Sequence, residues 1–206
     1  MRRTKEDTLL TKKQIIENAV KLFLQRGFSA TTLDEIAQIS NVTRGAVYWH
    51  FNDKLDIVNE LIETEHQNFK QLLNKLFNKN TPPLRKIEKI IKEIVLHFYD
   101  NKSFQDFIEL TWFKIEYSQL SRLRSSKAEL TDYFIENFNR VVIEAQKAGE
   151  IKKVVKSSEI TITIVNMING MYRLFFIFPK QINTKNKAMR FFKSYLSLIK
   201  YDNHSN

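Results

Sequence analysis

Four side chains on the short segment 44–50 bring charge, hydrogen-bonding groups and aromatic rings together within about two helical turns. They are Arg44, Tyr48, Trp49 and His50. Arg44 offers a planar fork of donors that suits a guanine edge or a phosphate group, and the spacing leaves both partners open. Ala46 and Val47 already provide an inward face, so we expect the four side chains to face outward. A purely structural helix would more often carry Lys, Glu and Gln at these positions.

Two short helices joined by a tight turn are predicted to position these side chains. The first, over 33–39, has apolar residues at helical spacing, and Thr32 with Glu35 forms a capping box at its start. Asn41 interrupts the pattern, and asparagine tolerates a left-handed backbone. The second helix covers 44–50. This layout is that of a helix-turn-helix whose second helix enters the major groove of DNA.

Further residues around this pair are candidates for contact with the DNA backbone. Thr31, Thr32 and Thr43 are helix caps first and possible phosphate ligands second. Trp49 either faces DNA or wedges against the first helix, and His50 is interpreted as a phosphate contact. The small residues Ala37 and Gly45 are expected to let the two helices cross closely. The complete predicted DNA-binding set is Thr31, Thr32, Thr43, Arg44, Tyr48, Trp49, His50 and Lys54.

The amino-acid sequence of this region resembles that of a known protein family. The run VTRGAVYWHFNDK follows LFLQRGFSATTLDEIA, and together they resemble the DNA-binding domain of the TetR family of bacterial repressors over about residues 11–60. The letters YWHF resemble the branch that controls multidrug efflux pumps. The remainder of the chain is similar only in length and helical pattern. The resemblance implies a dimeric, cytoplasmic repressor that leaves a palindromic operator when a lipophilic inducer, cationic or aromatic, binds.

Composition and charge bound the remaining possibilities. The 206 residues include no cysteine, which excludes disulfides and thiolate metal sites and suits a cytosolic protein. The first residues lack the apolar core of a signal peptide. Net charge is +10, but residues 1–54 contain nine Lys or Arg and six Asp or Glu, net +3, which leaves 24 minus 17, or +7, for the rest. Basicity alone therefore supports a polyanionic partner only weakly.

Four glycines and three prolines predict an almost wholly helical chain of about nine helices. We expect a three-helix DNA-binding domain over 1–53 and a six-helix ligand-binding and dimerisation domain over 54–206. Residues 1–9 are expected to be a mixed-charge arm. The predicted helices are 11–25, 33–39, 44–50, 53–77, 84–100, 103–117, 127–147, 157–178 and 184–200.

The last two predicted helices, within 157–200, carry more apolar surface than a monomer needs on its exterior, and we expect them to form a homodimer interface. The stretch 160–178 is about as long as a membrane span. Asn166, Asn169 and Arg173 interrupt its apolar character, so a helix buried in protein is preferred over one in lipid.

The segment 103–117 is the best candidate for a ligand site. Helical spacing would place Glu109, Phe113 and Glu116 on one face, where two carboxylates beside a ring suit a lipophilic cation. Alternatively, both glutamates are solvated or paired with a basic side chain. An acyl or anionic metabolite is the alternative inducer, with Arg173 as its anchor. The predicted ligand-binding set is His66, Phe98, Glu109, Trp112, Phe113, Glu116, Phe134, Asn166, Asn169 and Arg173, with His97 and Phe138 nearby.

Catalysis finds little support in the sequence. There is no Gly-rich phosphate loop, no nucleophile elbow and no HExxH pattern, and we expect no cofactor and no metal site. A helical enzyme with a relic DNA-binding domain would need turnover that depends on His66 or His97. A ligand-free architectural protein would instead bind DNA broadly, without a palindrome.

Overall fold

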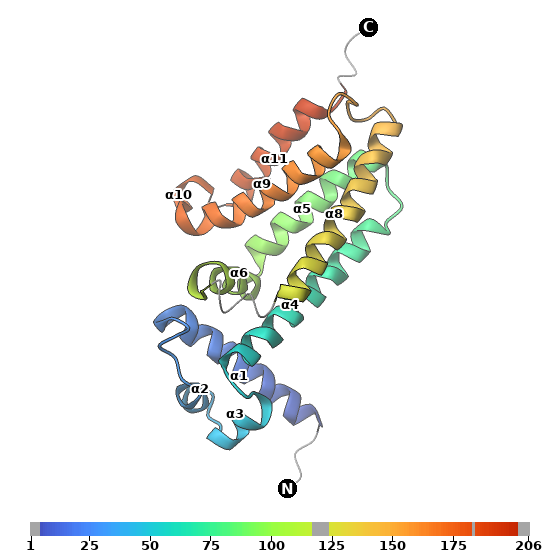
Figure 1. Ribbon diagram of the computed structural model, residues 1–206. Coiled ribbons are helices and arrows are strands. Elements are labelled where there is room, and N and C mark those ends of the chain that lie inside the picture. The colour runs from blue at the N-terminus through green and yellow to red at the C-terminus, as the bar shows by residue number, and fades with distance from the viewer. Residues whose placement is uncertain (1–4, 117–123, 183, 202–206) are drawn as a thin grey trace. The chain divides into compact units, whose positions relative to one another are not determined.

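The computed structural model describes residues 5–116, 124–182 and 184–201, and these are almost entirely helical (Figure 1). They form nine α-helices of seven or more residues and one of four. Within this part of the chain, β pairing is limited to a single antiparallel bridge between Ile151 and Lys200. The predicted all-α fold of about nine helices is therefore confirmed.

The contacts divide the chain into two compact units. Unit 1 comprises residues 1–67 and 103–127, and unit 2 comprises 68–102 and 128–206. Unit 1 contains α1 (Lys5–Arg26), α2 (Leu33–Ile39), α3 (Arg44–His50), α6 (Lys102–Glu109) and the π-helix η1 (Leu110–Lys114). Unit 2 contains α5 (Pro83–Asp100), most of α8 (Arg124–Lys147), α9 (Ser157–Ile177), α10 (Pro179–Ile182) and α11 (Lys185–Ile199). The helix α4 (Lys54–Phe77) runs through both, so this division falls inside α4 and not after Asp53.

The helix α1 packs against the helix-turn-helix through an apolar core. Ile15 and Phe23 on α1, Ile36 on α2 and Val47 on α3 are completely buried. Polar contacts fix the turn as well, because the Gln14 side chain donates to the Ser40 carbonyl at 3.0 Å. Burying these side chains removes apolar surface from water, which is the main stabilising contribution to such a small unit.

Capping residues and residues with a left-handed backbone begin or end these helices where the sequence predicts. Gly27, with φ +89°, ends α1, and Asn41 adopts the left-handed conformation at φ +52°. The Thr32 hydroxyl accepts from the Glu35 amide, and the Glu35 carboxylate accepts from the Thr32 amide, which completes the capping box. The Thr43 hydroxyl accepts from the Ala46 amide at 3.1 Å. The predicted turn and the caps at Thr32 and Thr43 are thus confirmed, whereas the predicted cap at Thr31 is wrong, because Thr32 is the residue that caps α2.

The first helix begins earlier than predicted. It starts at Lys5, so most of the expected arm over 1–9 is helical, and residues 1–4 lie outside the described part of the chain. Thr11 is not a cap, because its hydroxyl donates to the Asp7 carbonyl 2.8 Å away within the helix. Glu6 and Asp7 lie in the first turn, where negative charge complements the helix dipole.

The predicted helix over 103–117 is interrupted. It continues from α6 into the five-residue π-helix η1, in which the Ile115 amide donates to the Leu110 carbonyl at 3.2 Å. Ile115 then has an extended backbone. Ser103 lies in the first turn of α6, and its hydroxyl donates to Glu65 at 3.0 Å.

Unit 2 is built around α5, whose Ile90, Ile94 and Phe98 are buried. Phe98 packs against rings of α9, with its centroid 4.7 Å from that of Tyr172 and 5.0 Å from that of Phe175. The helices α9 and α11 lie side by side in this unit (Figure 1). By length and composition α9 could cross a membrane, and a third of its most apolar window is buried inside the protein. Much of its apolar surface is therefore not covered by its own chain.

Candidate nucleic-acid interface

The helix α3 separates an inward anchor from an outward aromatic face. Val47 is completely buried, whereas Tyr48 is 51% and Trp49 71% exposed. Trp49 does not wedge against α1, and its ring lies edge-on to the His50 imidazole at 4.5 Å. His50 is half-buried. The aromatic groups predicted to face a partner are therefore accessible to one.

Arg44 at the start of α3 is held by a carboxylate of the preceding helix. Its Nε lies 2.5 Å from Asp34 Oδ1, and both side chains are largely exposed. This partner could not be predicted from local spacing, since the two residues lie on different helices. The ion pair fixes the position of the guanidinium, and DNA would have to compete with Asp34 for it.

Gly45 differs from expectation. It lies on the exposed surface of α3, and a Cβ built there would come no closer than 4.0 Å to any atom, the Thr43 hydroxyl oxygen. The glycine is therefore not required for helix crossing, which uses the buried Ala37 and Val47. The missing side chain instead leaves the backbone of α3 open to an external partner beside Arg44.

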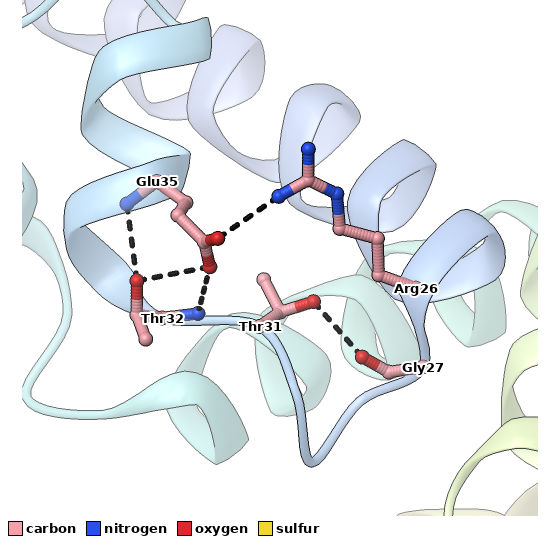
Figure 2. A network of polar contacts seen from close by, with 5 residues as sticks. All are labelled: Arg26, Gly27, Thr31, Thr32 and Glu35. Carbon is pink, nitrogen blue, oxygen red and sulfur yellow. Dashed lines mark hydrogen bonds and ion pairs between the residues drawn. The ribbon is translucent and has the colours of Figure 1, made fainter.

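The threonines before α2 divide into one buried and one exposed residue. Figure 2 shows Thr31 donating to the Gly27 carbonyl, at 2.9 Å, and Thr31 is only 1% exposed. This placement does not support the predicted phosphate contact by Thr31. Thr32 is exposed, and like Thr43 it combines a cap with an accessible position. Both remain candidates for backbone contact.

The Glu35 carboxylate ties this corner together. It accepts hydrogen bonds from Thr32 and from Arg26 Nη1, the latter at 2.9 Å (Figure 2). The hydrogen bonds from the Thr32 backbone and side chain, followed by the charge of Arg26, lower the pKa of Glu35. The end of α1 is thereby held to the start of α2.

Lys54, a predicted DNA contact, makes hydrogen bonds within its own chain. Its Nζ donates to the carbonyls of Phe28 and Ser29 at 2.6 and 3.1 Å, and it lies 4.8 Å from the Phe28 ring centroid. Partial burial lowers the pKa of Lys54, opposed by the negative charge of Glu35. The ammonium links the start of α4 to the loop after α1, and two of its three donors are used within the chain. Asp53 caps α4 as predicted, accepting from the Asp56 amide at 2.9 Å.

The ligand candidates of unit 1 are rearranged by the π-helix. The wider turn breaks the i, i+4, i+7 relationship on which the alignment of Glu109, Phe113 and Glu116 depended. Glu109 is half-buried with Lys114 Nζ 3.9 Å away, whereas Phe113 and Glu116 are exposed. Trp112 and His66 are half-buried, and the His66 ring lies edge-on to Phe107 at 5.9 Å.

The predicted ligand-binding set does not include Glu65, a buried carboxylate in the same unit. Glu65 is 5% exposed and accepts from Ser103 Oγ, and burial raises its pKa despite this hydrogen bond. The sequence does indicate this burial, because Glu65 lies in the apolar stripe of α4 between Ile62 and Phe69. This site joins Glu65, Ser103, His66 and Phe107 on α4 and α6.

The ligand candidates of unit 2 fall into two groups. Phe98 and Phe134 are buried in the core, with the Phe134 ring stacked on Phe138 at 5.2 Å. Asn166, Asn169 and Arg173 are exposed on α9. They share the outer face of α9 with Ile162 and Ile177, and this placement gives no support to a role in a ligand cavity.

The chain is similar to known proteins in both sequence and fold. Residues 15–61, from α1 into α4, match the family model described as bacterial regulatory proteins, tetR family. The HTH-type transcriptional regulator SrpR of Pseudomonas putida is 30% identical over 155 residues, which are 73% of this chain and 68% of SrpR.

Two solved structures share the fold across nearly the whole chain. One is NalD, the secondary repressor of the MexAB-OprM multidrug efflux pump in Pseudomonas aeruginosa, with a TM-score of 0.80, 22% identity and coverage of 96% of this chain and all of NalD. The other is a complex of SmeT with triclosan, with a TM-score of 0.79, 18% identity and coverage of 94% and 93%. The matched helix-turn-helix, the extended similarity to SrpR and the shared fold agree, and the chain belongs to the TetR family of bacterial transcriptional regulators.

Proposed function

We propose that this protein is a dimeric transcriptional repressor of a multidrug efflux operon that reads a palindromic operator through α3. The observation that carries the proposal is the outward placement of Tyr48 and Trp49 beside Arg44 on a helix held by the buried Val47. Arg44 would contact a guanine edge or a phosphate, and the open surface at Gly45 would admit the DNA backbone. The name of NalD supports efflux control as the biological role.

The proposed dimer uses the exposed apolar residues of α9 and α11. Large apolar side chains that a monomer would leave in water lie along both helices and just after α9: Ile162, Leu174, Ile177, Phe178, Phe191 and Leu198. To read a palindrome, such a dimer would need its two recognition helices roughly 34–36 Å apart, the spacing of successive major grooves. Repression would then take place in the cytoplasm, where the operator is accessible.

We further propose that a lipophilic inducer, cationic or aromatic, releases the repressor from DNA. The buried Glu65 carboxylate with Phe107 and His66 beside it offers charge and rings to a cation, and it replaces Glu109 and Glu116 as the primary candidate. Binding that favours a different spacing of the two α3 helices would weaken DNA affinity by about 1–3 kcal/mol, and DNA would weaken inducer binding equally. Because α4 contains Glu65 and begins directly after the helix-turn-helix, it is the proposed carrier of this coupling.

A specific feature favours the alternative of an acyl or anionic inducer. An open groove of about 760 Å³ between α5 and α11 in unit 2 has an apolar floor that includes Ile91 and Phe192. Its basic side chains are Arg85, Lys89, Lys92, Lys193 and Lys200, against the acidic Glu88 and Glu93. Lys200 is already paired with Glu88 at 2.5 Å, which leaves four basic groups for a carboxylate or phosphate.

Footprinting on the DNA that flanks the coding region tests this function. A protected palindrome is expected, and lipophilic cations added to the complex should remove the protection. Loss of protection with fatty acids alone would select the anionic alternative. Uniform protection without a palindrome would contradict the repressor and favour an architectural DNA-binding protein.

A further inference from the structure

One stripe of α9 combines charged, polar, small and apolar residues on a surface that its own chain leaves uncovered. At 3.6 residues per turn its members fall within an arc of about 100°. They are Glu159, Ile162, Asn166, Gly170, Arg173 and Ile177, all exposed except the half-buried Gly170. The opposite face holds the buried Ile164, Ile168 and Met171. The stripe is therefore accessible to another molecule.

The charges of this stripe are arranged symmetrically. Glu159 and Arg173 each lie seven residues from Asn166, on opposite sides. Neither side chain makes an ion pair with any residue in the described part of the chain. If two copies of α9 crossed antiparallel at Asn166, Glu159 would face Arg173 of the partner subunit, twice per dimer. Parallel pairing would instead bring like charges together.

The sizes of the stripe residues follow the same symmetry. Ile162 and Gly170 each lie four residues from Asn166, and Ile162 is 45% exposed. A Cβ built at Gly170 would meet nothing within 4 Å, so the fold of the single chain does not require a glycine there. A glycine inside a helix makes the helix less stable than an alanine would. We therefore look for the role of Gly170 in contacts with another molecule. In the antiparallel arrangement, the space above Gly170 receives Ile162 of the partner subunit.

Asn166 lies at the centre of this arrangement. A side-chain amide both donates and accepts, so two copies of Asn166 related by a two-fold axis can pair with each other. A single polar residue in an otherwise apolar helix interface selects the register in which it finds its partner, at some cost in stability. Asn169 lies beside it on the same exposed face.

We propose that α9 packs antiparallel against α9 of a second copy, crossing at Asn166, and that the Glu159–Arg173 pairs select self-association over pairing with other proteins of this fold. The inference rests on the homodimer proposed above and adds its register and its specificity. Selective association requires complementary contacts with the right partner and unfavourable contacts with wrong partners. In other registers, like charges would meet and make the contact unfavourable.

Charge exchange tests the register. Glu159→Arg and Arg173→Glu each create two like-charge contacts per homodimer, and each should raise the homodimer dissociation constant roughly tenfold at physiological salt. Mixing the two variants should yield mainly heterodimer, in which both contacts are again attractive, and the double variant should associate as the wild type does. Native mass spectrometry measures the proportions, with wild-type mixtures as the control. A statistical mixture of the two variants would overturn the register.

Exchanging the sizes of two side chains tests the register independently of charge. Gly170→Leu should also weaken the homodimer, and combining it with Ile162→Ala should restore association because the bulky and small positions are exchanged. Circular dichroism checks that each variant remains helical.

Ile177→Asp tests separately whether α9 lies in the interface. If Ile177→Asp dissociates the dimer while the charge and size variants show no pairing, the register is wrong and the dimer surface stands. If the wild type is monomeric, the proposed dimer itself fails.

Discussion

Arg44 Nε lies 2.5 Å from Asp34 Oδ1, so the guanidinium that we propose contacts DNA is already paired with a carboxylate of its own chain. An exposed ion pair of this kind contributes little to stability, typically below about 1 kcal/mol. The expected consequence of this ion pair is greater for binding, because DNA would have to replace the carboxylate with a phosphate or a guanine. Asp34 also keeps the guanidinium in one place at the start of α3.

Removing this carboxylate should strengthen DNA binding with little regard to sequence. For Asp34→Asn we expect higher affinity for random DNA and a dependence of log K on log salt that is steeper by about one unit, since Arg44 becomes available to a phosphate. Fluorescence anisotropy over a salt series measures both quantities. Glu17→Gln is the matched control, because Glu17 is the exposed partner of Lys13 on α1. Weaker binding by Asp34→Asn would show that the ion pair positions Arg44 and does not compete for it.

Thr31 and Thr32 should differ in what their substitution affects. Thr31→Val removes a buried hydroxyl that donates to the Gly27 carbonyl, and should lower the free energy of unfolding by about 1 kcal/mol. Operator affinity per folded molecule should stay unchanged. Thr32→Val should cost a similar amount through the lost cap and should also reduce affinity, since Thr32 is exposed. Urea titration and anisotropy together separate these effects. A selective loss of affinity in Thr31→Val would restore Thr31 as a DNA contact.

Glu65 should make stability depend on pH in a predictable direction. Its pKa is raised above 4.5, so its contribution to the free energy of unfolding is fully present below about pH 4.5. The contribution declines as pH rises through the folded-state pKa, because the ionised carboxylate is disfavoured by burial. Glu65→Gln should therefore gain stability relative to the wild type as pH rises above about 4.5, as measured by urea unfolding.

Glu63→Gln on the same helix is the control for the pH series. A constant difference between wild type and Glu65→Gln across this range would show that Glu65 does not titrate as proposed. The same variant should bind lipophilic cationic dyes more weakly if Glu65 is the anionic part of the inducer site. Unchanged dye binding by Glu65→Gln would exclude that role.

The helix-turn-helix was predictable because its signals are local. Thr32 with Glu35, Asn41 and Gly27 act through backbone conformation and hydrogen bonds within a few residues. The pairing of Arg44 with Asp34 and the use of Lys54 to hold the loop at Phe28 depend on packing between elements, which spacing along the chain does not reveal.

The structure does not bring the predicted ligand residues together, for two physical reasons. A regular helical period was applied to 103–117, but η1 inserts a wider turn and separates Glu109 from Glu116. Polar residues in the apolar α9 were interpreted as the wall of a cavity, whereas Asn166, Asn169 and Arg173 face outward. The helical period of α9 itself would have placed Asn166 and Arg173 on one stripe with Glu159. Burial of Glu65 could have been inferred from its place in the apolar stripe of α4.

Operator binding by Tyr48→Ala tests the central claim most directly. Tyr48 is 51% exposed on α3, so the variant should keep its free energy of unfolding within about 0.5 kcal/mol and its dimeric state. Its affinity for the footprinted palindrome should fall by about 1–3 kcal/mol, towards the affinity for random DNA. Gln67→Ala, an exposed substitution on α4, should change neither quantity. Protection of the same site by Tyr48→Ala at unchanged affinity and salt would contradict the assignment of α3 as the helix that reads DNA.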